Sequence, residues 1–357
     1  MRIALSTGGG DAPGLNAAIR AAVLSAVGRG WEAFGVKRGF AGLLGEDDVV
    51  PLDRKAVGGI AHLGGTILGT SRANPFCWPR RLTDTVEPID RSDELIENFN
   101  RRGFDALVSI GGDGSLAVAQ RLFEKGMNVV SVPKTIDNDV GCTITTFGFD
   151  TAVNTALEAI DKLHTTAESH DRVMVLEVMG RHAGFIALHA GVAGSADVIL
   201  IPEIPYDVEK VCEKVMARDR AGRKFSIVVV AEGAVPAAGH ADWDESVQRR
   251  DAAQVGGIAE CLAREIQRRT RKECRSLVLG HLQRGGSPTG YDRLLATRFG
   301  SAAVRAIADG KWGHMIALQS PHLVTVPVEL VLQQPKRVDP AHDIVGTART
   351  MGVSFGD

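Results

Sequence analysis

The strongest constraint on the fold is that short apolar runs repeatedly end in glycine and polar residues. Two such runs occupy residues 107–110 and 129–132, and they precede residues 111–115 and 133–139, which carry glycines, hydroxyls and carboxylates. Longer amphipathic segments separate the runs, in the alternation typical of βαβ units. Because parallel strands end at the same edge of a sheet, we expect these polar residues to share one ligand site.

The alternation extends along most of the chain. It predicts strands at residues 2–6, 31–36, 107–110, 129–132, 173–178, 198–201, 225–231 and 277–279. It predicts helices at residues 15–27, 93–101, 151–163, 185–191 and 256–269. A segment with three prolines, residues 72–92, is predicted to be a surface excursion. A chain of 357 residues exceeds the usual size of one hydrophobic core, so we expect two domains.

The composition argues against several functional classes. A net charge of -2 gives no reason to expect binding to nucleic acid or to an anionic membrane. The five cysteines are scattered without a C-x-x-C pair, which fits a reducing compartment better than disulfides or a zinc site. No apolar run has the length needed to span a bilayer. We therefore expect a cytoplasmic protein that binds neither nucleic acid nor a membrane.

The glycine-rich residues 8–14 lie between a predicted strand and a predicted helix. Glycines expose backbone N–H groups and a helix N-terminus adds the positive end of a dipole, so this loop can bind an anion. A tight turn without a ligand explains the same loop. An NAD-binding fold favours an acidic residue after the second strand, whereas Lys37 and Arg38 follow Val36 here. NAD is therefore disfavoured, and an NADP-binding oxidoreductase stays open.

Residues 111–115 and 133–139 carry the groups that phosphoryl transfer needs. The Gly-Gly-Asp-Gly-Ser segment can place phosphate against the backbone, and Asp113 can hold Mg²⁺ directly or through water. Asp137 and Asp139 allow one carboxylate to take a proton from an acceptor hydroxyl while the other orients the reacting groups. Lys134 can neutralise charge on the transferred phosphoryl group. We expect residues 111–115 to form a flexible turn and residues 133–139 to form a loop. Each segment alone is also consistent with a solvated turn or an Asx turn.

These residues resemble the 6-phosphofructokinase family. The resemblance covers most of the chain and includes motifs in the family's order at residues 64–72, 169–172, 177–181 and 279–288. It implies two Rossmann-like α/β domains with largely parallel sheets and an active site in the interdomain cleft. The phosphoryl-donor domain would comprise residues 1–148 and 283–333, and the sugar-phosphate domain residues 149–282 and 334–357.

The resemblance also implies a reaction and its residues. Asp137 would be the general base in the Mg²⁺-dependent, glycolytic transfer of a phosphoryl group from ATP to the 1-hydroxyl of fructose 6-phosphate. The other catalytic residues would be Arg181, Thr135 and Lys134. ATP would lie against Gly10, Arg72, Gly112, Asp113, Gly114 and Ser115, with Asp113 as the Mg²⁺ ligand. The sugar phosphate would be bound by Thr135, Asp137, Asp139, Arg172, Met179, Gly180, Arg181, Glu232, Arg275, His281 and Arg284.

Two of these cations imply an assembly. In this family, the residues matching Arg172 and Arg275 come from a neighbouring subunit, so the resemblance implies a homodimer or homotetramer with shared active sites. Guanidinium groups suit the task because they bind phosphate oxygens in pairs. Without the family, Arg271, Lys272 and Arg275 are equally consistent with one exposed basic turn.

The sequence gives mixed indications about the phosphoryl donor. Diphosphate-using members of the family carry Asp at the position of Gly114, where a carboxylate would exclude the α-phosphate of ATP. Gly114 therefore favours ATP. Lys134 matches the diphosphate pattern, although some ATP-using members also carry lysine there, and residues 73–90 resemble the mixed-donor branch. Diphosphate-dependent fructose 6-phosphate 1-phosphotransferase stays the alternative, with sedoheptulose 7-phosphate as a second acceptor in that case.

Two further alternatives and one regulatory expectation follow from the resemblance. A dinucleotide or lipid kinase would not need the phosphate-binding loop of His281 and Arg284, and a non-catalytic homologue would not need every catalytic side chain. Compact bacterial members bind an effector through interface arginines. Leu24 and His164 replace two of these arginines here, which disfavours that form of control.

Overall fold

The chain forms two compact units in a computed structural model that describes residues 1–78, 88–237 and 257–357. Unit 1 comprises Met1–Ile136, Val140–Thr151 and Arg284–Pro335, and unit 2 comprises Asp137–Asp139, Ala152–Gln283 and Lys336–Asp357. The predicted α/β class with mainly parallel sheets is confirmed. The assignment of donor and sugar to separate domains stays a prediction.

Unit 1 contains one large sheet with the strand order β12-β11-β5-β4-β1-β2-β3, and β6 also pairs with β5. Its strands are β1 (Arg2–Thr7), β2 (Glu32–Val36), β3 (Val49–Leu52), β4 (Ala106–Gly111), β5 (Val129–Thr135), β6 (Phe147–Gly148), β11 (His314–Gln319) and β12 (His322–Pro327). The pairs of β2 with β3 and of β11 with β12 are antiparallel, and the other pairs are parallel. The parallel centre therefore places the ends of β1, β4 and β5 at one edge.

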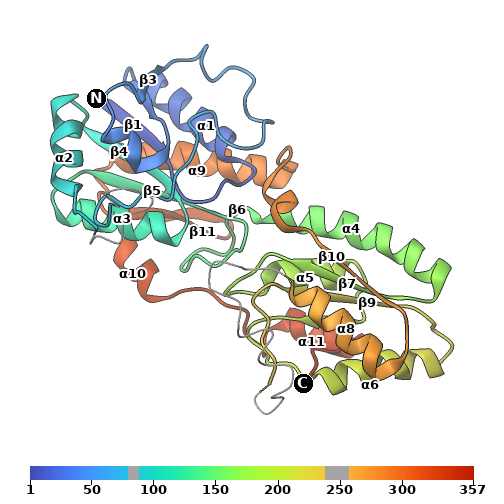
Figure 1. The fold of residues 1–357 in the computed structure, drawn as a ribbon. Helices are drawn as coiled ribbons and strands as arrows, with labels where there is room; N and C mark the ends of the chain where they lie inside the picture. Colours follow the sequence, from blue (N-terminus) through green and yellow to red (C-terminus); the bar gives the residue numbers. More distant parts are fainter. Residues whose placement is uncertain (79–87, 238–256) are drawn as a thin grey trace. The chain divides into compact units, whose positions relative to one another are not determined.

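Helices cover both faces of this sheet (Figure 1). They are α1 (Leu15–Gly28), η1 (Gly39–Leu43), α2 (Ser92–Arg101), α3 (Asp113–Glu124), α9 (Gly290–Ala308) and α10 (Val328–Gln333). Ile3 and Leu5 pack in the core that includes α1 and α9, whereas Ala4 packs in the core that includes α2 and α3. This alternation is the period of a strand buried on both faces.

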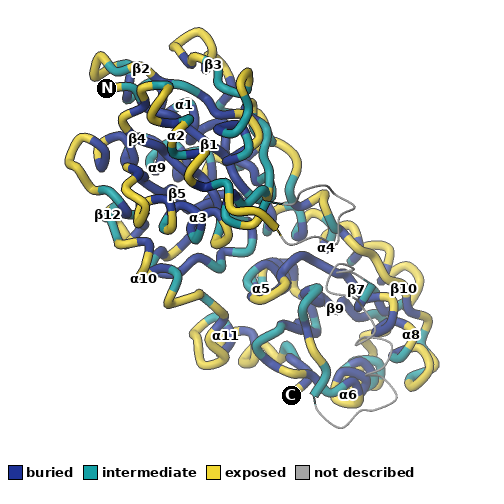
Figure 2. Tube along the Cα trace, turned by 60° about the vertical axis from the view of Figure 1, so that its left-hand side comes forward, coloured by how far each residue is buried: buried dark blue, intermediate teal, exposed yellow. Residues whose placement is uncertain are grey.

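Unit 2 contains a smaller sheet of four parallel strands in the order β10-β7-β9-β8. Its strands are β7 (Val173–Val178), β8 (Val198–Leu200), β9 (Ser226–Ala231) and β10 (Cys274–Val278). Its helices are α4 (Phe149–His170), which begins in unit 1, α5 (Phe185–Ala193), α6 (Val208–Arg220), α8 (Ile258–Thr270), η2 (Gly280–Arg284), which ends in unit 1, and α11 (Asp343–Thr350). The inner strands are buried in Figure 2, whereas β10 is an edge strand with mostly exposed residues.

Most predicted strands and helices lie where the sequence placed them, but three predictions were wrong in detail. Residues 113–115, predicted as a flexible turn, form the first turn of α3 because Ser115 and Leu116 donate to the carbonyl of Gly112. Pro133 to Thr135, predicted as loop, extend β5 by pairing with Gly111, Phe147 and Gly148. The strand predicted at 277–279 is β10, which starts at Cys274.

Part of the predicted surface excursion at 72–92, residues 79–87, lies outside the described residues, as does residue 256 of the predicted helix 256–269. Within the described part of the chain, no helix has the length and apolarity needed to cross a membrane.

The contact between α1 and α9 generates a stability prediction. A Cβ at Gly300 of α9 would lie 2.2 Å from the carbonyl oxygen of Ala18 in α1, so Gly300→Ala forces the helices apart. We expect a loss of about 1–3 kcal/mol and a lower melting temperature in circular dichroism. Gly346→Ala is the matched control, since Gly346 of α11 has no neighbouring atom within 4 Å of its Cβ position. That variant should keep or slightly raise the melting temperature, because the higher helix propensity of alanine adds up to about 1 kcal/mol to the free energy of unfolding. An unchanged melting temperature in Gly300→Ala would contradict the packing described here.

Candidate active site

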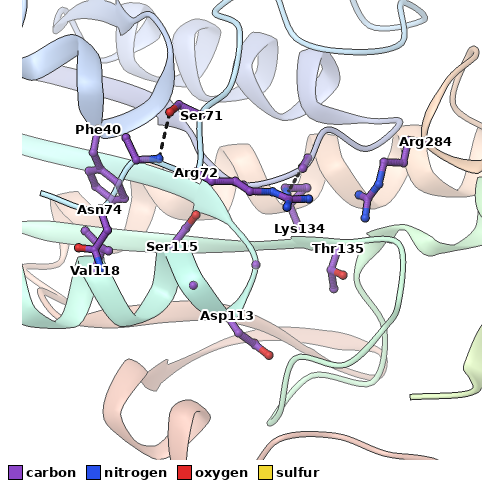
Figure 3. Close-up of a pocket in the computed structure, with 15 residues that line it drawn as sticks. Phe40, Ser71, Arg72, Asn74, Asp113, Ser115, Val118, Lys134, Thr135 and Arg284 are labelled. Carbon is purple, nitrogen blue, oxygen red and sulfur yellow. Dashed lines mark hydrogen bonds between the residues drawn. The ribbon is translucent and has the colours of Figure 1, made fainter. Parts of the chain in front are cut away.

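Unit 1 holds a cavity of about 360 Å³ at the edge of its sheet where β1, β4 and β5 end (Figure 3). Nine of the predicted site residues line it: Gly10, Arg72, Gly112, Asp113, Gly114, Ser115, Lys134, Thr135 and Arg284. Six further residues line it: Gly9, Phe40, Ser71, Ala73, Asn74 and Val118. We call this cavity the donor pocket, after the role that the sequence predicts for most of its lining.

The first loop of the donor pocket is fixed by its backbone. The N–H of Gly8 donates to the carbonyl of Ile110 at the end of β4, and the N–H of Gly9 donates to the carbonyl of Ser71, each at 2.9 Å. The hydroxyl of Thr70 donates to the carbonyl of Gly9 at 2.6 Å. Gly9 has a φ of 79°, in the left-handed region that favours glycine. The segment that carries Arg72 is therefore tied to the loop after β1.

Glycine is also required where α3 begins. A Cβ at Gly8 would lie 2.5 Å from the Ser115 hydroxyl, and a Cβ at Gly111 would lie 2.3 Å from the Cβ of Ser115. Ser115 is buried between these two strand ends, which brings the N-terminus of α3 against the loop after β1. Because the first amides of a helix point outward and carry partial positive charge, this end of α3 suits an anion.

Gly114 faces open space. No atom lies within 4 Å of its Cβ position, and the residue is exposed in the donor pocket. Asp113, beside it, is also exposed. A side chain at position 114 would therefore project into the donor pocket without displacing protein atoms.

One end of the donor pocket is cationic. Lys134 is only 3% exposed, and its ammonium donates to the carbonyl of Gly10. Arg284 donates from Nη1 to the carbonyl of Asp11 at 3.1 Å, and a Cβ at Gly10 would lie 2.7 Å from the same nitrogen. Arg72 reaches across the pocket toward Lys134 in Figure 3. Three cations beside bare backbone amides form a site for a polyanion.

The opposite end of the donor pocket is apolar and was missed by the sequence analysis. Phe40 of η1 and Val118 of α3 lie together there with Asn74 (Figure 3). Val118 follows Gly114 by four residues, so both lie on one face of α3. Had α3 been predicted from the sequence, its periodicity would have placed Val118 beside Gly114. No sequence pattern of this kind indicated Phe40.

In unit 2, the predicted sugar-binding residues follow neighbouring strands. The N–H of Gly233 donates to the carbonyl of Gly180 at 3.2 Å, and a Cβ at Gly233 would lie 2.0 Å from the carbonyl oxygen of Arg181. The loop after β7, which carries Met179, Gly180 and Arg181, therefore lies directly beside Glu232 at the end of β9. Parallel strands bring these side chains to one edge, as the sequence predicts.

The loop of His281 joins the same edge through Gln283. This fully buried side chain accepts from the N–H of Met179 and donates to the carbonyl of Gly280, each at 3.3 Å. Glu177, in the same motif as Met179, has a structural role instead. Its carboxylate accepts from the N–H groups of Gly257 and Ala259 at the start of α8.

Arg172 and Arg275 lie at the opposite edge of this sheet. Arg172 precedes β7, Arg275 is the second residue of β10, and both form ion pairs with Glu273. His281 follows the end of β10 at Val278. Three residues of strand already separate Arg275 from Val278 by about 10 Å. Arg172 and Arg275 therefore lie toward the start of these strands, whereas His281 lies beyond their end.

Asp137 and Asp139 follow β5 and belong to unit 2. Both are half-buried, and Asn138 between them has a φ of 55°, a conformation that Asn tolerates better than most residues. The carbonyl of Asp139 accepts from the N–H of Lys336 at 2.9 Å. Asp137 follows Thr135 of the donor pocket by two residues.

Comparison with known proteins decides the family. The pattern of the phosphofructokinase family matches residues 2–307. The chain belongs to this family. A relative named ATP-dependent 6-phosphofructokinase, from Chloroflexus aurantiacus, is 52% identical over 356 residues, which cover 100% of this chain and 98% of that protein. Among solved structures of the family, Pichia pastoris phosphofructokinase in the T-state has a TM-score of 0.80 and 31% identity. That match covers 93% of this chain and 35% of the Pichia chain, so this chain spans about a third of its length.

A similar relative carries a different donor in its name. A protein of Streptomyces coelicolor named pyrophosphate–fructose 6-phosphate 1-phosphotransferase is 50% identical over 359 residues and matches 100% of both chains. Overall sequence identity therefore does not distinguish ATP from diphosphate as the donor. The choice has to be argued from the residues of the donor pocket.

Proposed function

We propose that this chain is an ATP-dependent 6-phosphofructokinase, which phosphorylates the 1-hydroxyl of fructose 6-phosphate to give fructose 1,6-bisphosphate. The observation that carries the choice of ATP is the donor pocket with two chemically different ends. Lys134 and Arg72 suit a triphosphate, and Phe40 and Val118 suit a nucleobase. The open space at Gly114 leaves room between these ends. Diphosphate would leave the apolar end unused.

Diphosphate is the second candidate donor. Lys134 favours it, since a buried ammonium beside the first loop compensates a compact, highly charged donor. The similarity to the Streptomyces coelicolor protein also supports it. The NADP alternative loses support because Arg38, one of the two basic residues that suggested it, forms an ion pair with Asp48.

In the proposed mechanism, the 1-hydroxyl oxygen of the sugar attacks the γ-phosphorus as the bond from the γ-phosphorus to the bridging oxygen breaks. Asp137 takes the hydroxyl proton, and ADP leaves with the electron pair of the broken bond. Lys134 and Arg181 balance charge on the transferred group, and Thr135 and Asp139 orient the reactants. Met179, Gly180, Glu232, His281 and Arg284 would bind the sugar phosphate. This division of roles rests on the residues that the family motifs match.

We propose Mg²⁺ as the metal. Asp113 fits it, because Mg²⁺ is usually held by one or two carboxylates together with substrate phosphates and water. Outside residues 79–87 and 238–256, no group of three or more His, Cys, Asp or Glu side chains is arranged to hold a metal alone. The ion would reduce the negative charge of the donor phosphates, while Asp113 and the α3 amides fix their position.

We further propose a cytoplasmic homo-oligomer, a dimer or tetramer, with active sites shared between subunits. The five cysteines are free, which suits a reducing compartment. The support for shared sites is the placement of Arg172 and Arg275 at the edge of the small sheet opposite to His281. Arg172 is 27% and Arg275 is 53% exposed at the side chain, so both can reach a second chain. Each active site would then combine His281 of one subunit with two arginines of its neighbour.

The donor assignment is tested by Gly114→Asp. A carboxylate at this open position would repel the α-phosphate of ATP, so we expect kcat/KM for ATP to fall by at least about a hundredfold. Phosphorylation of fructose 6-phosphate with Mg²⁺ is measured with ATP and with diphosphate. Gly114→Ala is the control and should retain activity with ATP, because its methyl group meets open space. If the native protein uses diphosphate and not ATP, the donor follows the indication of Lys134 and the ATP assignment from Gly114 is wrong.

The general base is tested by Asp137→Ser. Removal of the proton acceptor should lower kcat by about 10²–10⁴-fold with little change in melting temperature. Asp161→Ser, an exposed carboxylate on α4, is the control and should leave kcat unchanged. Near-normal turnover in Asp137→Ser would assign the base elsewhere.

Shared sites are tested by mixing Arg275→Ala with His281→Ala. Each variant alone should lose affinity for fructose 6-phosphate. In a hybrid dimer, one site carries both lesions and the other carries neither, so random mixing should restore about a quarter of the native activity. No recovery after co-refolding, with hybrids detected by an affinity tag, would place Arg275 and His281 of each site in the same subunit.

A further inference from the structure

The C-terminal return segment at residues 334–338 passes beside the loop of Asp137 and Asp139. A Cβ at Gly141 would lie 2.0 Å from the carbonyl oxygen of Gln334, so the segment contacts the chain just after this loop. Two residues later, the N–H of Lys336 donates to the carbonyl of Asp139 at 2.9 Å. The segment is therefore in direct contact with the proposed catalytic loop.

The same segment is anchored on its other side by Glu203. The carboxylate of Glu203 accepts from the N–H of Val338 at 2.9 Å and from the N–H of Gly184 at 3.0 Å. Gly184 lies three residues after Arg181 and directly precedes α5. One carboxylate thus holds the return segment and the end of the sugar-binding loop together.

The Lys336 side chain is half-buried between the catalytic loop and α5. Its ammonium lies 5.0 Å from the centroid of the Phe185 ring, a distance typical of a cation–π contact. Its charge interacts favourably with the carboxylate of Asp139. A lysine fixed in this way places one positive charge near the carboxylate of Asp139.

We propose that Lys336 is a positioning residue for phosphoryl transfer, whose ammonium holds the carboxylate of Asp139 in its working orientation. The inference rests on the proposed function, since it requires the loop of Asp137 and Asp139 to carry the chemistry. Lys336 need not touch the substrate. It acts through Asp139, while its backbone N–H fixes the loop independently of the side chain.

The charge of Lys336 is also sensitive to pH. Burial lowers the pKa of this ammonium to about 8, against a smaller opposing effect of Asp139. His189 of α5 faces the same ammonium, and its pKa is lowered by burial and by the charges of Lys336 and of His342 at the start of α11. Below pH 8 the ammonium form holds Asp139, and above pH 8 this interaction is lost. We therefore expect kcat of the native enzyme to fall as the pH rises through about 8.

The test compares Lys336→Met, Lys336→Arg and the control Arg337→Met in the full-length enzyme. Methionine keeps most of the length and the backbone N–H but removes the charge, so kcat at pH 7 should fall at least about tenfold, with KM for fructose 6-phosphate nearly unchanged. Arginine should restore kcat and shift the alkaline fall upward, because guanidinium stays charged. Arg337 is the exposed neighbouring cation of the same segment, and its replacement should change neither kcat nor the pH profile.

The outcomes separate the inference from the function on which it rests. Suppose that the native enzyme phosphorylates fructose 6-phosphate, and that Lys336→Met keeps both the native kcat and the native decrease in kcat at alkaline pH. That result would overturn the positioning role alone. A lower melting temperature with an unchanged pH profile would also overturn it, since that pattern indicates a structural contact only. Absence of fructose 6-phosphate phosphorylation in the native enzyme, with either donor, would overturn the proposed function itself.

Discussion

The donor pocket depends on the close approach of three backbone segments around one buried hydroxyl. Ser115 lies so near Gly8 and Gly111 that neither position accepts a Cβ without displacement. This contact joins the ends of β1 and β4 to the first turn of α3, and it leaves backbone amides where phosphate would bind. The cations Lys134 and Arg284 then contact the loop that this packing holds in place. The chemistry of the pocket is therefore built on backbone geometry, with charged side chains added around it.

The sequence predicted the strands well because buried parallel strands are short, apolar and bounded by glycine. It failed at the start of α3, where Gly-Gly-Asp-Gly-Ser has the composition of a turn. The helix forms there because Ser115 finds a tertiary position between two glycines, and a local pattern does not contain that contact. The prediction of a loop at Pro133 was wrong for a related reason. The pairing of β11 with β5 ends at Ser131, so a residue without an N–H is tolerated beyond it.

Candidate site residues were predictable to the extent that they end strands. This rule brought Gly10, Asp113 and Lys134 to one cavity and Met179 and Glu232 to one edge of the other sheet. It gave no signal for Phe40, because one aromatic residue in a glycine-rich turn has no periodicity to detect. It gave none for Lys336, which lies far along the chain from Asp139 and meets it only through the fold. Long-range contacts of this kind set orientation, which sequence patterns do not encode.

The open space at Gly114 has an evolutionary consequence. A position that tolerates any small side chain without repacking carries almost no folding cost, so mutation at that site is filtered by ligand choice alone. A glycine codon becomes an aspartate codon by one nucleotide change. If Gly114 selects the donor as proposed, lineages of this family would exchange one phosphoryl donor for another by this change while the fold stays constant. Proteins about half identical to this chain, named for ATP in one organism and for pyrophosphate in another, are what such a low barrier would produce.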